Sequence, residues 1–457
     1  MNQLSAHDAA RMIRDGQLTS EALMQACLDR IAQRDVEVRA WVALDPARAL
    51  DEARAADRLL RERGPDAVGP LHGVPIGVKD ILDTADHPTC YGSPIFRDHR
   101  PIADAACVAL AREAGAIVLG KTATAEFASI HPPATRNPRN LAHGPGGSSS
   151  GSAAAVADAM VPLAFGTQTA GSTIRPAAFC GIVGYKPSFG LINRAGLKFS
   201  AESLDTIGLL ARSVGDVALF AHAVAGQPLP PGGDHDARGT HDADRSRGHR
   251  REHRWRIGLC RTPYWMRADE GARNALLMAA ERLAAGGASI TEVELPQALE
   301  GAWDAHATMI RYEAARAMTW ETRHHRAAFS AGFAERIDEG LAIPFAAWRV
   351  ANARAVECRR LHEGLFSPDA EGADGIDILL TPSAIGEAPK GITHTGDSLF
   401  NRNWTLLGAP CIHLPTTTGP QGLPLGIQLV GHYDGDIGLL ECARWVETTL
   451  QSDPRPA

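Results

Sequence analysis

The sequence lacks the features of a membrane-inserted, secreted or nucleic-acid-binding protein. It has no apolar run of 18 or more residues, and His7 and Asp8 interrupt the N-terminal stretch where a secretory signal needs an apolar segment. The formal net charge is −7, so the chain has no basic excess to attract nucleic acid or an anionic membrane surface. We therefore expect a cytoplasmic protein whose main partner is neither nucleic acid nor a membrane.

Closely spaced cysteine pairs are missing as well. The eight cysteines are spread over the chain with no C-x-x-C pair, and most stand in segments with the composition of a core. Such spacing is typical of reduced, buried thiols and not of a disulfide framework or a zinc site. We expect no metal and no cofactor.

Two short motifs match known patterns but lack the surroundings that these patterns need. Residues 147–151 fit the G-x-S-x-G nucleophile elbow, yet the Gly/Pro-rich residues 143–146 cannot form the strand that leads into such an elbow. Residues 115–122 fit G-x-x-x-x-G-K-[ST], but their four variable positions are apolar, as in a buried strand and not in a phosphate-binding loop. These contexts argue against an α/β-hydrolase and against nucleotide binding.

The order of apolar segments and chain breakers predicts a large α/β protein. The 457 residues, 44% of them hydrophobic, can build a sizeable core, and strand candidates alternate with helix candidates over residues 70–225. This alternation predicts a largely parallel sheet covered by helices on both faces. Around this core we expect a helical arm over residues 1–65, a mostly helical substrate-side segment over 257–370 and a C-terminal part of the core over 371–457.

Residues 227–256 differ in composition from their surroundings. They are rich in Pro, Gly, Asp and Arg, carry histidines at 235, 241, 249 and 253, and have no large apolar residue between Leu229 and Trp255. This composition predicts a disordered insertion. A metal site is the sharper alternative, but irregularly spaced histidines among arginines make a poor ligand set.

The stretch from Gly144 to Gly181 carries the strongest chemical signal. Two turns of small residues, 146–152 and 169–173, are separated by an alanine-rich helix candidate and a short apolar strand candidate. Both turns present hydroxyls and backbone N–H groups, which suits attack of a serine on a carbonyl carbon and stabilisation of the resulting oxyanion. A flexible Gly/Ser linker is the alternative, although the apolar segments on both sides argue against it.

A serine nucleophile needs a base, and neither turn contains a histidine. Lys79 stands in the apolar stretch Gly73–Leu82 and can act as the base if burial keeps its amine neutral. An ordinary lysine titrates near 10.4, so its pKa must fall by roughly 3, at a cost of about 4 kcal/mol. The segment alone equally allows a lysine at a strand edge whose amine reaches solvent.

Together these stretches resemble the amidase signature family. The shared segments are Gly-Val-Lys-Asp at 77–80, Gly-Gly-Ser-Ser-Ser-Gly-Ser at 146–152 and Ala-Gly-Ser at 170–172, and weaker similarities extend over nearly the whole chain. The resemblance implies one amidase domain over residues 1–457 with a mixed, twisted sheet. It implies an enzyme that hydrolyses a small-molecule carboxylic amide to an acid and ammonia or an amine through an acyl-serine. It implies no cofactor and is compatible with a homodimer.

The resemblance also implies a Ser-cisSer-Lys triad. Ser172 and Ser148 have the separation of 24 positions that the family's two serines have, so Ser172 would be the nucleophile and Ser148 the bridging serine after a cis bond from Gly147. Lys79 would be the base, and Ser149 the neighbour that hydrogen-bonds the lysine. The oxyanion hole would come from the backbone amides around Thr169, Ala170, Gly171 and Ser172.

Two positions depart from the family pattern. The Asp four residues before the nucleophile is Gln168 here, and the Arg two residues after it is Ile174. We hypothesise that hydrogen bonds centred on Gln168 replace the lost ion pair. Cys180 is a rival nucleophile, although Phe179 beside it favours a packed, inert thiol.

Two other functions stay open. One is an amidotransferase subunit that passes ammonia to a partner protein, but the Gln that such subunits carry three residues after the nucleophile is Arg175 here. The other is a catalytically silent binding protein, against which the three retained catalytic residue types count. The loops Phe127–Pro133 and Thr395–Trp404 are candidate walls of a substrate pocket.

Overall fold

A computed structural model describes residues 1–229, 254–367 and 375–451. Most of the predicted insertion over 227–256 therefore lies outside the described residues, and so do its four histidines. In the parts of the chain that the structure describes, no helix is both long enough and apolar enough to span a bilayer.

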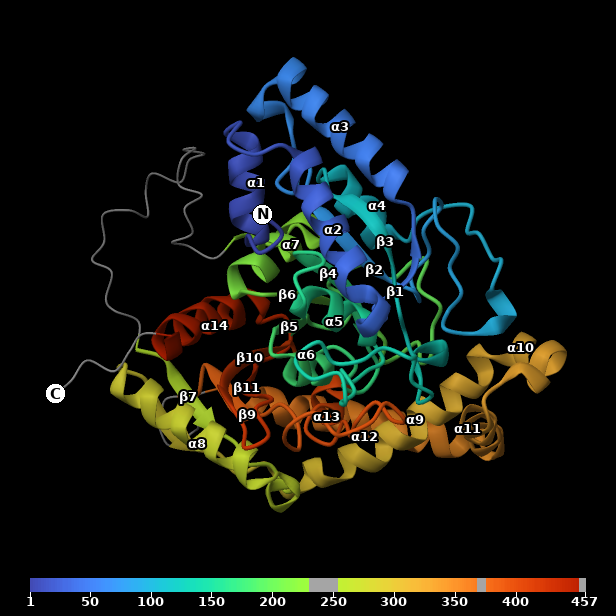
Figure 1. Cartoon of the computed structure of the whole chain (residues 1–457). Helices are drawn as coiled ribbons and strands as arrows, with labels where there is room; N and C mark the ends of the chain where they lie inside the picture. Colours follow the sequence, from blue (N-terminus) through green and yellow to red (C-terminus); the bar gives the residue numbers. More distant parts are fainter. Residues whose placement is uncertain (230–253, 368–374, 452–457) are drawn as a thin grey trace.

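One sheet of 11 strands runs through the molecule, in the order β1-β3-β2-β4-β6-β5-β10-β11-β9-β7-β8 (Figure 1). The strands are β1 (Trp41–Leu44), β2 (Pro75–Lys79), β3 (Ile117–Thr122), β4 (Leu163–Gln168), β5 (Val183–Lys186), β6 (Thr206–Ala211), β7 (Arg256–Leu259), β8 (Ser289–Glu292), β9 (Ile378–Pro382), β10 (Cys411–Thr418) and β11 (Pro424–Val430). Strand β3, which carries the G-K-T residues, is buried along its whole length, as its apolar positions predict.

The sheet is mixed, as expected, but it is not largely parallel. Only β2 with β3, β2 with β4, β7 with β8 and β7 with β9 are parallel, and the other six neighbouring pairs are antiparallel. Short connections between strands explain part of the antiparallel pairing. The loop between β10 and β11 has five residues, 419–423, which is too short for the crossover that a parallel pair needs.

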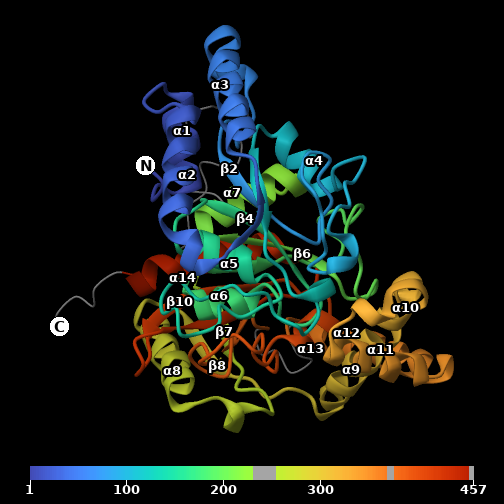
Figure 2. The same ribbon diagram turned by 45° about the vertical axis from the view of Figure 1, so that its right-hand side comes forward.

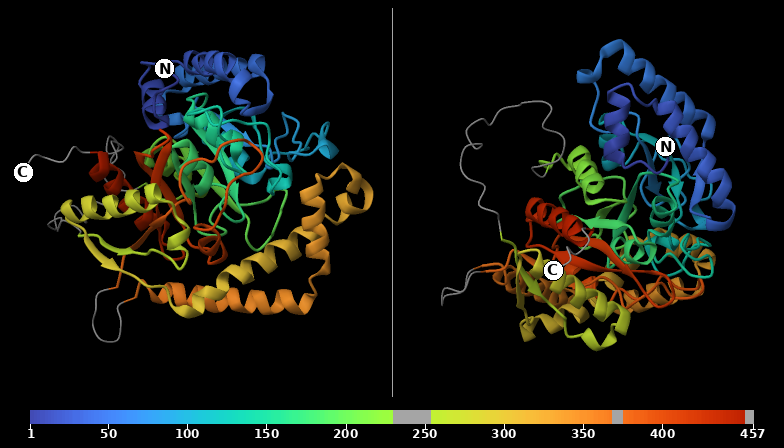
Figure 3. Two further views of the ribbon diagram at one scale, coloured as in Figure 1. Left: turned by 60° about the horizontal axis from the view of Figure 1, so that its bottom comes forward. Right: turned by 60° about the vertical axis from the view of Figure 1, so that its left-hand side comes forward.

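Helices cover both faces of this sheet (Figures 1 and 3). They are α1 (Ala6–Arg14), α2 (Ser20–Val38), α3 (Pro46–Arg63), α4 (Ala106–Glu113), α5 (Ser150–Ala157), α6 (Ile174–Cys180), α7 (Val214–Ala225), α8 (Glu270–Ala285), α9 (Ala302–Ala317), α10 (Thr319–His325), α11 (Ala331–Ala342), α12 (Phe345–Gly364), α13 (Arg402–Leu406) and α14 (Asp436–Gln451). Side chains of strand β4 enter two different hydrophobic cores, one on each face of the sheet. Leu163 and Phe165 belong to the core that includes α4, α7 and α14, whereas Ala164 belongs to the core that includes α2 and α5. This alternation is the two-residue period of a strand.

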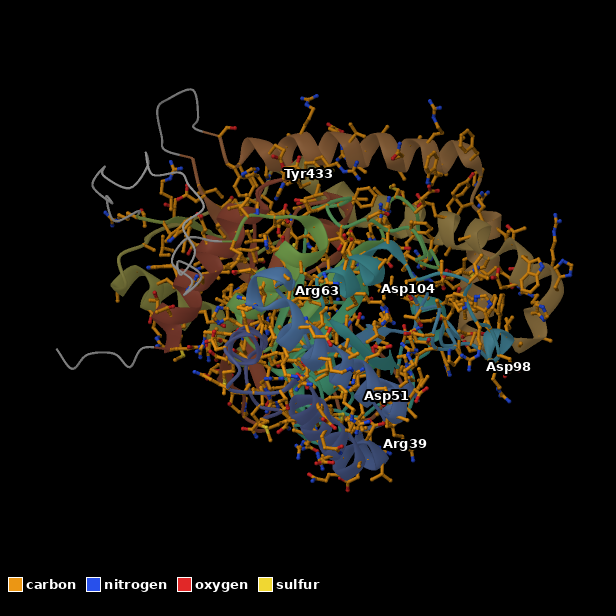
Figure 4. All side chains as sticks on the ribbon, turned by 90° about the horizontal axis from the view of Figure 1, so that it is seen from above. Arg39, Asp51, Arg63, Asp98, Asp104 and Tyr433 are labelled. Atoms are coloured by element: carbon orange, nitrogen blue, oxygen red, sulfur yellow. The ribbon has the colours of Figure 1, made fainter. Side chains whose placement is uncertain are left out.

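The N-terminal helices α1, α2 and α3 form one end of the molecule. Side chains that precede these helices, Ser5, Thr19 and Asp45, each accept a hydrogen bond from a backbone N–H of the first turn, which fixes where the helices begin. Helix α3 exposes charged residues such as Asp51 and Arg63 (Figure 4). The arm is not wholly helical, because β1 between α2 and α3 joins the sheet edge beside β3.

Helices α9 to α12 lie together at another end, beside the loop that carries α13 (Figure 2). Helix α9 packs against α11, α12 and α13. This group follows β8 in the chain and precedes β9, so it is a long helical insertion between two strands of the sheet. Its inner side faces the candidate site, which makes it part of the site's wall.

Candidate active site

The candidate site lies at the carboxyl ends of β2 and β4. These strands run parallel with Ile76 opposite Leu163 and Val78 opposite Phe165, so Lys79 at the end of β2 comes beside the last residues of β4. Ser172 follows β4 in the next turn. Loops that leave the carboxyl ends of neighbouring parallel strands meet at one edge of the sheet, which is where sites in such sheets are built.

Lys79 is fully buried, and its amine contacts two hydroxyls. Its Nζ is 2.8 Å from Ser148 Oγ and 2.7 Å from Thr167 Oγ1. Burial lowers the pKa of Lys79 to about 7, while the charge of Asp205 acts to raise it and that of Arg175 to lower it. The alternative of a lysine whose amine reaches solvent is excluded, and a neutral amine is available near pH 7.

Ser148 is also buried, and the peptide bond that precedes it is cis, as expected. Ser149 departs from its expected place. Its hydroxyl is 3.2 Å from both the backbone O and the backbone N of Thr167, donating to the first and accepting from the second. The prediction that Ser149 hydrogen-bonds the lysine is therefore wrong. Thr167 has that role, and a lone threonine within a strand candidate carries no signal of it.

The turn from Thr169 to Ser172 is held by its carbonyl oxygens. Each of three carbonyls has one donor: His306 Nε2 at 2.8 Å for Thr169, Thr405 Oγ1 at 2.8 Å for Ala170 and the backbone N of Arg175 at 2.9 Å for Gly171. The N–H of a trans peptide points away from its C=O, so the amides of Ala170, Gly171 and Ser172 point away from these donors. No residue within the described ranges accepts a hydrogen bond from them, which leaves three N–H groups for an oxyanion.

The side chain of Thr169 is fixed from a second direction. Its hydroxyl donates to the buried Asp205, whose other oxygen accepts from the backbone N of Ser200 at 2.7 Å and of Ala201 at 3.0 Å. Burial raises the pKa of Asp205 to about 6. His306, which donates to the Thr169 carbonyl, is neutral, because burial lowers its pKa to about 3.

The hypothesised hydrogen bonds of Gln168 are present. Its Oε1 accepts from the backbone N of Thr173 at 2.9 Å and of Ile174 at 3.1 Å, at the start of α6. Its Nε2 donates to Thr405 Oγ1 at 3.0 Å, and that hydroxyl in turn holds the Ala170 carbonyl. A neutral amide thus satisfies the first N–H groups of the helix and orients the turn.

A cavity of about 480 Å³ opens over Ser172. Parts of both predicted loops line it, residues 128–130 from the first and 395–398 from the second, so the prediction of these pocket walls is confirmed. Helices α9, α11 and α13 complete the wall with His306, Arg311, Arg336 and Arg402. Arg402 belongs to the predicted loop Thr395–Trp404, and α9 and α11 to the predicted substrate-side segment 257–370, but no sequence pattern singles out His306, Arg311 or Arg336.

Cys180 does not compete with Ser172. It is fully buried, its Sγ lies 3.5 Å from the Pro145 carbonyl, and burial raises the pKa of its thiol to about 12. It does not line the cavity. As for a metal, no group of three or more His, Cys, Asp or Glu side chains in residues 1–229, 254–367 and 375–451 is placed to hold one.

Comparison with known proteins gives similarities over nearly the whole chain. Residues 22–440 match the Amidase family model. A glutamyl-tRNA(Gln) amidotransferase subunit of Roseiflexus castenholzii (strain DSM 13941 / HLO8) is 34% identical over 476 residues, covering 96% of this chain and 94% of the relative. The solved native peptide amidase from Stenotrophomonas maltophilia is 30% identical with a TM-score of 0.79, covering 100% of this chain and 98% of that one. An inhibitor-bound complex related to an s-triazine catabolic enzyme is 28% identical with a TM-score of 0.84, covering 98% of both chains.

Proposed function

The chain belongs to the amidase family and hydrolyses a carboxylic amide C–N bond, and we propose that it does so through an acyl-serine formed on Ser172. The observation that carries this proposal is the amine of Lys79, buried and 2.8 Å from the Ser148 hydroxyl. A desolvated amine with a pKa of about 7 is a usable proton acceptor at neutral pH. The substrate is a small-molecule amide that enters the cavity over Ser172.

In the first half of the reaction, Ser172 Oγ attacks the amide carbon and its proton passes to Ser148, while the proton of Ser148 passes to Lys79 Nζ. The amides of Ala170, Gly171 and Ser172 stabilise the oxyanion that forms. When the C–N bond breaks, Lys79 returns the proton through Ser148 to the departing nitrogen. The products are an ester between the acyl group and Ser172, and ammonia or an amine.

In the second half, a water molecule attacks the ester, and the same two residues take its proton. The tetrahedral intermediate is again stabilised by the three amides, and its collapse returns the proton to Ser172 Oγ. The acid leaves and Lys79 is neutral once more. Charge and protons balance over the cycle, since one water is consumed and no group other than the amide is changed.

The test is release of ammonia or amine by the purified full chain from a panel of small amides. We expect turnover by the wild type, none by Ser172→Ala, and turnover unchanged by Ser289→Ala, a control in the edge strand β8. A fluorophosphonate should label the wild type and not Ser172→Ala. Full activity of Ser172→Ala would refute the assignment of the nucleophile.

A second candidate function is that of a subunit that delivers ammonia to a partner protein. It is favoured by the similarity to the amidotransferase relative. Hydrolysis of simple amides by the chain alone, at rates that added partner proteins do not raise, would count against it. Absence of both turnover and fluorophosphonate labelling would instead favour a catalytically silent binding protein.

A further inference from the structure

The cavity over Ser172 has an excess of positive charge. Four arginines line it, Arg175, Arg311, Arg336 and Arg402, and Asp397 is the one carboxylate among the described residues of its wall, which leaves an excess of three positive charges. The lining histidine, His306, is neutral because burial lowers its pKa to about 3. Cations held near one another repel, and an uncharged ligand does not relieve this repulsion. A cavity with this charge therefore favours an anionic ligand.

Two of the arginines already have partners that explain their position. Arg175 is buried and donates to the carbonyl oxygens of Gly147 and Thr395, the latter at 2.7 Å, so it ties two loops of the site together. Arg311 Nε lies 2.7 Å from Oε2 of Glu339, a residue outside the cavity lining. Neither arrangement requires a ligand.

The other two arginines are less well compensated. Arg402 donates to Ser398 Oγ at 3.0 Å, lies 3.7 Å from Asp397 Oδ1, and has its guanidinium carbon 3.4 Å from the centre of the Trp303 ring. Its Nε is buried and has no hydrogen-bond partner among the described residues. Arg336 makes neither an ion pair nor a hydrogen bond with any residue in the described ranges, although it lines the cavity, and only the more distant charge of Glu339 acts to raise its pKa against burial and the charge of Arg311.

Three of these cations come together from separate helices. Arg311 stands on α9, Arg336 on α11 and Arg402 at the start of α13, and α9 packs against both of the others. The three are close enough to affect one another's charge: burial first, and then the charges of Arg336 and Arg311, lower the pKa of Arg402 to about 10, while the charge of Asp397 acts to raise it. Bringing three guanidinium groups to one wall costs free energy; Glu339 offsets part of this cost through Arg311 and Arg336, and a bound anion would offset more of it.

We infer that the amide substrate carries a carboxylate, which binds between Arg336, Arg311 and Arg402 while its amide group lies at Ser172. This inference rests on the proposed function. A guanidinium presents paired N–H donors in the geometry of a carboxylate, and the partly dehydrated wall strengthens such hydrogen bonds. The substrate class is thus the monoamide of a small dicarboxylic acid or an amide of similar shape.

Binding to Ser172→Ala, measured by calorimetry, tests the inference without turnover. The probes are pairs of equal carbon number, succinamate with butyramide and glutaramate with valeramide. We expect the carboxylate member of each pair to bind about tenfold tighter or more, as expected for a charge-assisted hydrogen bond. The added change Arg336→Gln should remove this preference, and Arg336→Lys should retain part of it. Arg61→Gln, at an exposed position on α3, is the matched control and should change nothing.

The outcomes separate the inference from the proposed function. Equal binding of both members, or a preference that survives Arg336→Gln, overturns the inference. Wild-type hydrolysis of neutral amides without a carboxylate preference would overturn it too and leave the proposed function intact. Tight binding of succinamate without any wild-type turnover would support the inference and overturn the proposed function. Should Arg336→Gln not fold, raising the salt concentration must weaken binding of the carboxylate members and leave the neutral ones unaffected, and equal salt dependence overturns the inference.

Discussion

Replacing Lys79 by Met should abolish turnover and yet make the protein more stable at neutral pH. The side chain is fully buried, and a methionine fills the same space without an amine to dehydrate. Burial is the main reason that the pKa of this amine falls from its ordinary value of 10.5 to about 7 in the folded chain. The fold therefore disfavours the charged amine that the unfolded chain prefers.

The sign of the pH dependence follows from this difference. Because the pKa of Lys79 is lowered by folding, the unfolded chain binds more protons between pH 7 and pH 10.5, and the wild type's free energy of unfolding rises with pH across that window. A pKa difference of about 3.5 corresponds to about 5 kcal/mol, present in full as a penalty below pH 7 and absent above pH 10.5. At pH 7 the penalty is about 4 kcal/mol.

Lys79→Met removes this penalty but leaves the hydroxyls of Ser148 and Thr167 without their partner. That loss costs about 1–3 kcal/mol, so we expect the variant to be about 1–3 kcal/mol more stable than the wild type at pH 7 and no more stable at pH 10. Urea unfolding at pH 6, 7, 8, 9 and 10 measures the difference. Lys121 and Lys186 are also buried with lowered pKa values, but they are present in both proteins and cancel.

The control for this series is Lys390→Met, in which an exposed lysine is lost. Its free energy of unfolding should follow that of the wild type at every pH. Curves for wild type and Lys79→Met that run parallel from pH 6 to pH 10, or a variant less stable at pH 7, would refute a buried amine with a lowered pKa. The proposed base would then be lost with it, since an amine that stays charged at pH 7 cannot accept a proton.

Two further substitutions probe the support of the site. Gln168→Ala removes the acceptor of the Thr173 and Ile174 amides and the donor to Thr405, so urea unfolding should show a loss of about 1–3 kcal/mol, with a lower kcat. Gln168→Glu keeps the acceptor and should lose less, and an unchanged Gln168→Ala would remove the case for this network. Asp205→Asn removes a charge that raises the pKa of Lys79, so the acidic limb of the kcat/KM profile between pH 5 and pH 9 should move to lower pH. A limb that stays in place or moves to higher pH would contradict the coupling.

The sequence is informative where chemistry and spacing coincide in short segments. Lys79 can be proposed as a base from its apolar surroundings, and the resemblance to the amidase signature family then selects Ser148 and Ser172 by their separation of 24 positions. Lys79 and the turn of Ser172 come together because the parallel strands β2 and β4 have their carboxyl ends at one edge, whereas Ser148 reaches the Lys79 amine from the turn before α5. The Gln168 network can also be anticipated, since an amide is a good substitute for the hydrogen-bonding capacity of a lost carboxylate.

The rest of the site depends on distant contacts that no local pattern encodes. His306 bonds the Thr169 carbonyl across 137 positions of the chain, and Thr405 bonds that of Ala170 across 235. In the sequence, a single histidine or threonine inside a predicted helix looks the same as a residue that only packs against its neighbours. The prediction for Ser149 is wrong for a related reason. Ser149 follows Ser148 in the sequence, but its hydroxyl bonds the backbone of Thr167, and the Thr167 hydroxyl is the one that reaches the lysine. This choice depends on the geometry of the strand and not on the sequence around Ser149.

These distant contacts also determine which parts of the chain the proposed active site needs. The three amides of the proposed oxyanion hole are oriented through carbonyls whose donors come from α9, from α13 and from α6. Only α6 belongs to the stretch 70–225 that carries the proposed triad, so this stretch alone lacks two of the three donors that orient its turn. Helices α9 and α13 therefore do more than line the cavity. In the proposed mechanism they complete the geometry that stabilises the oxyanion, so a change in them that shifts His306 or Thr405 should lower kcat while Lys79, Ser148 and Ser172 are unchanged.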